Sequence, residues 1–329
     1  MKPPTKGQGF EPREVLFSPL SACNLRCRHC SVAPGSVRLP VTAALRFLDS
    51  CRGTPVERIG FTGGEPFLYP SFLEAVSARA VRLGLLFDRI TTNAVWFRTI
   101  GELRTALTRL RDKGYDGSFG VSLDAFHGTG VAKPAAFIRT AAEIWNRPDI
   151  AGVVAVRGVR EAETEERLAA LAWKLEARLS VRQGRRIIAS DAFFIPVTAI
   201  DLVPLGRAAD LVDPWRGAWF KEDFCRGPGH VFYVLPDGAV KPCCGYATDD
   251  ERLTIGNIKH HTAADLIARA AKNDYVRAVF ELGLTRIRQR LLAGGTKFPG
   301  RTANHCYFCH HLLTSVPRPR LDASLGSAR

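Results

Sequence analysis

The sequence predicts an α/β fold, in which a strand–helix repeat precedes a smaller domain with a β-hairpin and helices. The first observation is that short apolar strands alternate with helical segments over residues 14–200, at a spacing of roughly 30 to 40 residues. Strand–helix units that follow one another along the chain favour parallel strands joined by right-handed crossovers. A full eight-fold barrel needs about 250 residues, so the repeat is expected to form a partial barrel or a doubly wound sheet. The second observation is that the repeat stops near residue 201.

Apolar stretches between polar turns are expected to form the strands of the repeat. They lie near residues 14–18, 58–62, 88–92, 118–123, 152–156 and 186–195. Thr42 is expected to cap the first helix, Pro70 to begin the second and Gly114 to end the third. The clearest amphipathic stretch is residues 164–179. Catalytic groups of such a sheet lie at the C-terminal ends of its strands.

The remaining segments flank this repeat. Residues 1–13 form an N-terminal extension, and residues 201–219, rich in proline and glycine, are interpreted as a linker. Two apolar runs joined by Pro236, Asp237 and Gly238 then predict a hairpin. Helices are expected at residues 262–280 and 284–292, and the tail at 317–329 is expected to be disordered.

The composition limits the possible classes of protein. With 46% hydrophobic and 24% charged residues among 329, the chain is expected to be globular. It begins without an apolar signal sequence and has no run approaching about 18 apolar residues, which predicts a cytoplasmic protein without a membrane partner. Its nine cysteines are then expected to be metal ligands or reactive thiols. The net charge of +14 is spread along the chain without interleaved aromatics, which argues against nucleic-acid binding.

Three cysteines follow the first strand with the spacing C-x3-C-x2-C, at Cys23, Cys27 and Cys30. On a loop, three thiolates can converge on one face of an iron–sulfur cube and leave the fourth iron without a protein ligand. Structural zinc is the alternative, but it requires four protein ligands. His29 could supply the fourth only with awkward geometry.

This spacing, together with Gly63, Gly64, Glu65 and Pro66 after the second strand, resembles the radical S-adenosylmethionine superfamily. The resemblance implies a partial (β/α)6 TIM-like barrel over residues 14–200. It also implies that the open iron of a [4Fe-4S] cluster binds S-adenosylmethionine, which one electron cleaves to a 5′-deoxyadenosyl radical. A reducing partner such as flavodoxin or ferredoxin would supply the electron.

The same resemblance assigns roles to residues. Cys23, Cys27 and Cys30 would hold the cluster, and His29 would lie beside the adenine. The methionyl ammonium would meet Gly63, Gly64 and Glu65, because glycines admit the backbone and a carboxylate suits a cation. Alone, the two glycines would indicate only an ordinary strand-to-helix turn. Methionyl and ribose contacts are expected from the ends of the third and fourth strands, at Asn93, Ser122 and Asp124.

A second set of cysteines lies downstream. Cys225, Cys243, Cys306 and Cys309, with the hairpin between them, resemble the twitch version of the SPASM auxiliary-cluster domain, placed at residues 220–316. The resemblance implies one fully cysteine-ligated [4Fe-4S] cluster, and therefore two clusters in total. Zinc, bound by cysteines alone or with histidine, is the competing interpretation. The last two cysteines and His310 also form a C-x-x-C-H haem motif, but covalent haem attachment requires export.

Two cysteines remain. Cys51 is expected to pack as a small hydrophobic residue in the first helix. Cys244 directly follows an expected ligand, on a hairpin expected to lie over the barrel mouth. Its weak S–H bond could give a hydrogen atom to a carbon radical. It could equally be an alternative ligand or a packing residue.

Four motifs resemble the radical S-adenosylmethionine epipeptide epimerases: residues 228–244, TTNAVW, SLDAFH and the closing C-x-x-C. These enzymes convert L-residues of ribosomally made peptides to D-residues, so the resemblance implies a peptide partner, such as a short ribosomal precursor. The radical removes a Cα hydrogen and a cysteine, here Cys244, returns one from the opposite face. One departure is the family's Pro-Gly-x-Asp turn, which here reads Pro228-Gly229-His230-Val231.

Two competing functions follow from the same residues. A twitch-type carbohydrate enzyme, such as an aminocyclitol dehydrogenase or a sugar epimerase, would also use the open cluster, and its auxiliary cluster could accept an electron from the substrate. A non-catalytic, zinc-binding module would use the cysteines only as structural ligands.

Overall fold

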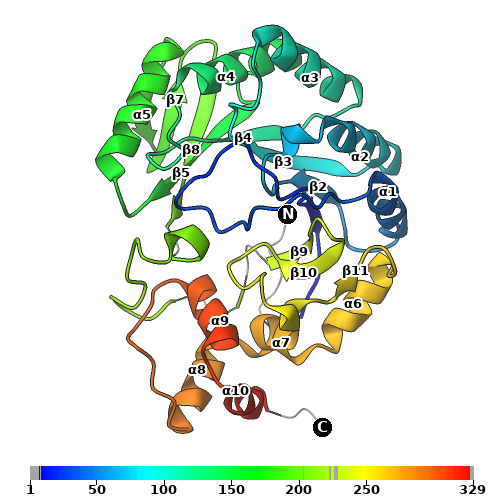
Figure 1. The fold of residues 1–329 in the computed structure, drawn as a ribbon, viewed down its shortest axis with the longest axis vertical. Coiled ribbons are helices and arrows are strands. Elements are labelled where there is room, and N and C mark those ends of the chain that lie inside the picture. The colour runs from blue at the N-terminus through cyan, green and yellow to red at the C-terminus, as the bar shows by residue number, and fades with distance from the viewer. Residues whose placement is uncertain (1–6, 8, 203, 222–223, 226–228, 327–329) are drawn as a thin grey trace. The chain divides into compact units, whose positions relative to one another are not determined.

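The computed structural model describes residues 7, 9–202, 204–221, 224–225 and 229–326. The chain divides into two compact units, each described by itself (Figure 1). The barrel unit comprises Phe17–Leu45 and Arg58–Val212. The hairpin unit comprises Met1–Leu16, Arg46–Glu57 and Asp213–Arg329.

A mostly parallel sheet forms the centre of the barrel unit, in the order β2-β3-β4-β5-β8-β7-β6. Neighbours from β2 to β8 pair in parallel, whereas β8, β7 and β6 pair antiparallel. The strands are β2 (Arg58–Phe61), β3 (Leu86–Thr92), β4 (Ser118–Ser122), β5 (Ala151–Arg157), β6 (Arg178–Arg182), β7 (Arg185–Ala189) and β8 (Phe194–Asp201). The prediction of an α/β fold with parallel strands is confirmed.

The helices of the barrel unit lie between these strands. They are η1 (Pro66–Leu68), α2 (Pro70–Leu83), α3 (Ile100–Asp112), α4 (Ala132–Trp145) and α5 (Glu161–Lys174), and the short η2 (Gly206–Ala208) follows β8. As predicted, Pro70 begins α2, where its missing N–H has no intrahelical partner to lose. Gly114 follows the end of α3 with a φ of +86°, which suits glycine.

The structure corrects the last strand of the repeat. The predicted strand at 186–195 is divided between β7 and β8, because Ser190 and Asp191 interrupt the apolar run and lie in the turn that separates the two strands. The hairpin of β6 and β7 turns at Gln183 and Gly184, both with positive φ. β8 is the strand that pairs in parallel with β5. The predicted helix at 164–179 ends earlier, because α5 stops at Lys174 and the chain enters β6.

Two elements occupy the chain positions where the units divide: β1 (Glu14–Phe17) and α1 (Val41–Ser50). Thr42 lies inside α1 and does not cap it, which corrects the predicted cap. Residues 201–212, placed in a linker by the sequence, belong to the barrel unit.

The hairpin unit contains the strand order β11-β10-β9-β1, with β9 and β10 antiparallel. Its further strands are β9 (Gly229–Val234), β10 (Ala239–Cys243) and β11 (Gly256–Asn257). Its helices are η3 (Glu251–Leu253), α6 (Ala263–Ala271), α7 (Asp274–Arg277), the π-helix η4 (Ala278–Leu282), α8 (Leu284–Ala293), α9 (His305–Thr314) and α10 (Arg318–Leu325). The predicted hairpin is confirmed. The tail predicted to be disordered forms α10 over its described part, with Leu321 buried.

Within the described residues, no helix has the length and apolarity needed to cross a membrane.

An aromatic cluster fills the core between β4 and the helices of the barrel unit. Phe119 on β4 is 1% exposed, and its ring centroid lies 5.2 Å from that of Phe137 and 5.3 Å from that of Trp145. The indole Nε1 of Trp145 donates to the carbonyl of Tyr115 at 2.7 Å. Burial of these rings holds α4 against the sheet.

We therefore expect Phe119→Ala to lower the free energy of unfolding by about 3–5 kcal/mol, because it removes a fully buried ring and leaves a cavity. Urea denaturation followed by circular dichroism would measure the change. The matched control is Val181→Ala on β6, a residue 68% exposed, which should change stability by less than about 0.5 kcal/mol. Equal effects of the two variants would contradict this account of the core.

Candidate active site

The three cysteines of the first motif share one loop, residues 18–40, called here the cysteine loop. None of the nine cysteines, all of which are described, forms a disulfide. Burial, followed by charge interactions with Cys23 and Cys30, raises the pKa of Cys27 to about 11. The thiols therefore interact with one another, and binding a metal centre would release their protons.

The cysteine loop is closed at its base and held from outside at one point. The amide of Leu39 donates to the carbonyl of Pro19 at 2.8 Å. The guanidinium Nε of Arg207, in η2 beyond β8, donates to the carbonyl of Cys27 at 2.8 Å. Sequence reasoning missed Arg207, because a lone arginine in an expected linker carries no local signal.

Gly63 and Gly64 allow the chain after β2 to approach the cysteine loop. Gly63 has a φ of +117°, and a Cβ on Gly64 would lie 2.1 Å from the carbonyl oxygen of Ala22. The amides of Gly64 and Glu65 donate to the carbonyls of Leu20 and Ala22 at 3.0 and 2.9 Å. The glycines are therefore required by a close backbone contact. Their predicted contact with the methionyl ammonium stays a prediction.

Glu65 lies buried at the junction of two strand ends. Its carboxylate accepts hydrogen bonds from the amide of Phe67 at 3.2 Å, the hydroxyl of Thr92 at 2.9 Å and the amide of Asn93 at 2.8 Å. Burial raises its pKa to about 7, and these three donors oppose the shift. The carboxylate connects the turn after β2 to the end of β3. Glu65 is only 1% exposed and bonded within the chain, and its predicted contact with the methionyl ammonium stays a prediction.

Asn93 joins the end of β3 to the cysteine loop. Its Nδ2 donates to the Oδ1 of Asn24 at 2.8 Å and to the Sγ of Cys23 at 3.6 Å. Its Oδ1 accepts from the amide of Val95 at 2.9 Å. Both amide hydrogens are thus used within the chain, and one lone pair of Oδ1 is left for the predicted methionyl contact.

Asp124 orders the loop after β4. It is 0% exposed, and its Oδ1 accepts from the amides of Phe126 and His127 at 2.8 and 3.2 Å and from the His127 ring at 2.8 Å. Its Oδ2 accepts from the amide of Val156 at 3.2 Å. Burial alone would raise the pKa of Asp124, but the hydrogen bond and charge interaction with His127 lower it overall. Its expected ribose contact stays a prediction, as does that of Ser122, which ends β4 half-buried.

Two histidine rings meet beside this carboxylate. The rings of His29 and His127 lie 4.9 Å apart between centroids, in an edge-to-face arrangement. Burial lowers the pKa of His29 to about 4, so its ring is neutral near pH 7. Ligand atoms of the two histidines and Asp124 lie within 4.8 Å of one another. Asp124 Oδ1 already accepts three hydrogen bonds, one of them from His127, so this oxygen is not free to bind a metal. The buried Nδ1 of His29 has no hydrogen-bond partner among the described residues, and its ring contacts those of Phe126 and His127. Sequence reasoning missed His127, although it lies three residues after Asp124.

In the hairpin unit, the structure brings the other expected ligands together. Burial raises the pKa of Cys225 well above its usual range, and charge interactions with Cys243 and Cys306 add to the shift. Burial also raises the pKa of Cys309 well above its usual range, and charge interactions with the other three thiols add to the shift. A Cβ on Gly229 would lie 2.6 Å from the Sγ of Cys225, so only glycine fits beside this sulfur. Four neighbouring thiols are a donor set that suits an iron–sulfur cluster or zinc.

Cys244 lies in the bend directly after β10 and is exposed. The pairing of β10 with β9 shifts register between Lys241 and Cys243, a bulge that changes the direction of the following side chains. Protein atoms around the sulfur, and then the charges of Cys243 and Glu14, raise the pKa of Cys244 to about 12. Its thiol therefore stays in the S–H form near pH 7. Cys51, by contrast, is 3% exposed and packs as a small hydrophobic residue, as predicted, but it lies directly after the end of α1 and not inside that helix.

His230, the residue before the Val231 that stands in place of the family's aspartate, fixes the N-terminal segment to the hairpin. Its Nδ1 accepts from the amide of Glu11 at 3.1 Å, and its carbonyl accepts from the amide of Arg13 at 2.9 Å. The imidazole also lies 4.6 Å from the ring of Phe280 on η4. Pro228, in the same motif, lies outside the described residues.

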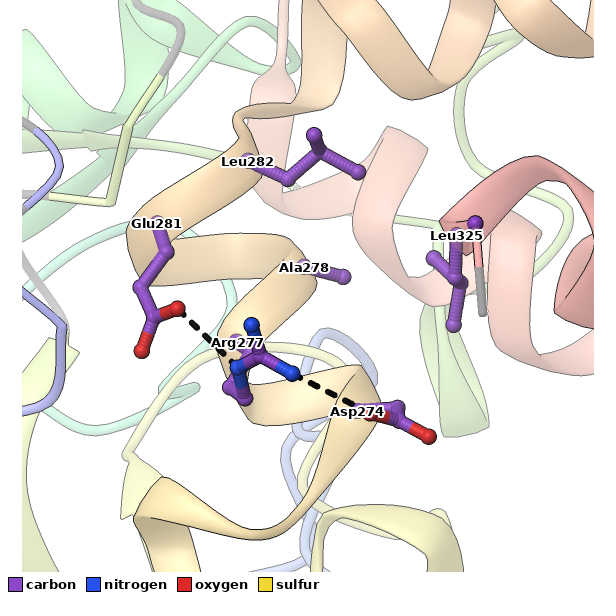
Figure 2. Close-up of a pocket in the computed structure, with 7 residues that line it drawn as sticks. Asp274, Arg277, Ala278, Glu281, Leu282 and Leu325 are labelled. Carbon is purple, nitrogen blue, oxygen red and sulfur yellow. Dashed lines mark hydrogen bonds and ion pairs between the residues drawn. The ribbon is translucent and has the colours of Figure 1, made fainter. Parts of the chain in front are cut away.

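A small cavity of about 150 Å³ lies on the same unit (Figure 2). Arg277 on its wall pairs with Glu281 at 3.0 Å and with Asp274 at 3.5 Å. These charges satisfy one another, and the cavity contains none of the cysteines. It is therefore separate from the candidate site.

Comparison with known families adds to this geometry. The radical SAM superfamily model matches residues 17–152, and the SPASM iron–sulfur cluster-binding model matches residues 225–290. The chain carries a radical SAM domain followed by a SPASM domain. These domains bind S-adenosylmethionine and iron–sulfur clusters, and the interacting thiols of each unit fit such clusters. The SPASM match includes Cys225 and Cys243 and ends before Cys306 and Cys309.

Individual relatives agree with this assignment. A GTP 3′,8-cyclase from Chlorobaculum tepidum is 38% identical over 113 residues, which are 33% of this chain and 32% of that protein. The chain thus matches about a third of that relative's length. The solved structure of native anSMEcpe with bound AdoMet has a TM-score of 0.51 at 16% identity, over 97% of this chain and 100% of that one. The complex of anSMEcpe with AdoMet and the Cp18Cys peptide also has a TM-score of 0.51, at 14% identity over 97% of this chain and 100% of that one.

Replacing Glu65 tests the buried carboxylate. We expect Glu65→Gln to destabilise the protein by about 1–3 kcal/mol, because an amide NH2 would face an N–H donor. The raised pKa means that the folded wild type favours protonated Glu65. The stability of wild type relative to Glu65→Gln should therefore fall as pH rises from about 5 to about 7, and level off above it. Urea denaturation at several pH values measures this difference. A difference that grows with pH would contradict the raised pKa.

Metal analysis tests the two cysteine sets. After anaerobic reconstitution, we expect Cys27→Ala and Cys309→Ala each to lose about four iron and four sulfide per chain. Cys51→Ala is the matched control and should keep the wild-type content. Zinc without sulfide in either set would overturn its assignment as an iron–sulfur site.

Proposed function

We propose that the protein is a peptide epimerase, which inverts an L-residue of a short ribosomally made precursor to the D-form. When bound, the reduced cluster and S-adenosylmethionine would supply the radical chemistry that removes the Cα hydrogen of the substrate. The carbon radical then takes a hydrogen atom from the S–H bond of Cys244 on the opposite face. One electron from a reductant such as flavodoxin or ferredoxin and one solvent proton restore the thiol.

The observation that carries this proposal is the position of Cys244. Charge interactions link its thiol to the thiols of Cys243 and Cys306, yet it is exposed where Cys225 is buried. Cys243 ends β10, whereas Cys244 lies in the bend that follows it. A fifth thiol beside a four-cysteine set is not needed to complete that set, since an iron–sulfur cube takes four cysteines.

Two findings support a peptide as substrate. A structure with the same fold, anSMEcpe, has been solved with a bound peptide. The net charge of +14 would favour an acidic precursor by attraction. Val231 stands at the position of the family's carboxylate, and His230 beside it holds the N-terminal segment, so the peptide would be oriented by other groups.

The barrel unit would position the cluster and S-adenosylmethionine. The neutral His29 would lie beside the adenine, with its ring held by His127, whose own orientation is fixed by the buried Asp124. Cys23, Cys27 and Cys30 would hold the cluster, and Asn93 connects this loop to the strand ends. The carboxylates of Glu65 and Asp124 are satisfied by hydrogen bonds inside the barrel unit, so binding would require little reorganisation of these two groups.

The test uses a candidate precursor peptide encoded beside the gene, with S-adenosylmethionine and dithionite in heavy water. The wild type should release 5′-deoxyadenosine and add one deuterium at the inverted carbon, because the thiol exchanges with solvent. Cys244→Ala should still release 5′-deoxyadenosine but lose net inversion at least about 100-fold. Chiral amino-acid analysis and mass spectrometry measure both.

The control is Cys51→Ala, which removes a packing thiol and should invert the residue as the wild type does. Normal inversion by Cys244→Ala would show that this thiol is not the donor. A product without solvent deuterium and lighter by two hydrogens would establish a dehydrogenase instead.

A further inference from the structure

We infer that Asn93 sets the reduction potential of the cluster on the cysteine loop by donating an N–H to the sulfur of Cys23. The inference rests on the radical SAM cluster of the proposed function and is independent of the peptide chemistry. It gives Asn93 a role toward the cluster in addition to any contact with S-adenosylmethionine.

The geometry of the side-chain amide fixes which atom faces the sulfur. The amide N–H of Val95 donates at 2.9 Å, so the atom of Asn93 that receives it is the oxygen. Nδ2 must then point to the other side, where it lies 3.6 Å from Cys23 Sγ and 2.8 Å from Asn24 Oδ1. Each of its two hydrogens has one acceptor, which leaves no other orientation that satisfies the group.

The backbone holds this side chain in place. The amide of Asn93 donates to the buried carboxylate of Glu65 at 2.8 Å, at the end of β3. Asn93 itself is 7% exposed, so water does not readily replace its hydrogen bonds. The donor is therefore part of the strand end and not of a mobile surface group.

A hydrogen bond to a ligand sulfur favours the reduced cluster, because reduction adds negative charge that the sulfurs share. Cys23 accepts one such bond from Asn93 and another from the amide of Leu25 at 3.4 Å. Backbone donors persist whatever the side chains are. The Asn93 contact is the one that a substitution can remove, so it is where the sequence can adjust the potential.

The experiment is a dithionite titration of the reconstituted full-length enzyme, followed by electron paramagnetic resonance without S-adenosylmethionine or peptide. Asn93→Leu keeps the approximate shape but removes the donor, so the midpoint potential should become more negative. Asn93→Asp keeps the acceptor for Val95 but places a negative charge beside the sulfur. Its potential should be more negative still.

The control is Asn146→Gly, at the end of α4, where a φ of +50° suits glycine. The cluster of this variant should have the same midpoint potential as the cluster of the wild type. Iron content per chain, measured on every variant, separates a shifted potential from a lost cluster. If Asn93→Leu fails to assemble the cluster, Asn93→Asp alone decides the outcome.

An unchanged midpoint in an Asn93 variant with full iron content, or a shift toward positive values, would overturn the inference and leave the proposed function standing. Absence of a reducible cluster on the cysteine loop of the wild type would instead overturn the radical SAM site itself.

Discussion

The candidate active site depends on one buried carboxylate. Glu65 is almost fully covered, and a buried charge without partners costs several kcal/mol. Its partners are the turn that it belongs to and the end of β3, so satisfying the charge forces these two segments together. Asn93, fixed in this way through its backbone, then reaches Cys23 through its side chain. The position of the cysteine loop therefore depends on the ends of β2 and β3, which themselves contain no cysteine.

Asp124 repeats this arrangement two strands away. Its carboxylate also accepts backbone amides and one side-chain group, and it too lies at the C-terminal end of a strand. In both cases the acid orders a loop through its hydrogen bonds. The groups left to line the site are then neutral: the ring of His29 and the backbone of Gly63 and Gly64. Preorganised neutral groups suit a site whose charged chemistry is supplied by its cofactors.

Sequence patterns predicted the parallel strands, the hairpin and both sets of cysteines, because periodicity, turn residues and ligand spacing are local signals. They did not separate β7 from β8, since only two polar residues, Ser190 and Asp191, interrupt the apolar run there. They predicted disorder where α10 forms, because that helix buries Leu321 through contacts that composition does not show. For Glu65 and Asp124, the sequence indicated the charge but not the burial, because burial depends on the packing of segments far apart in the chain. Arg207 and His127 had no signal of their own.

The central claim is that the thiols divide into an open set of three on the cysteine loop and a closed set of four in the hairpin unit, with Cys244 outside both. The most direct measurement is the electron paramagnetic resonance spectrum of the reduced enzyme before and after S-adenosylmethionine is added. The account predicts that one cluster signal shifts and that the other stays unchanged, because only the three-cysteine cluster has an iron free to bind the cofactor. Two shifted signals, or none, would contradict this division.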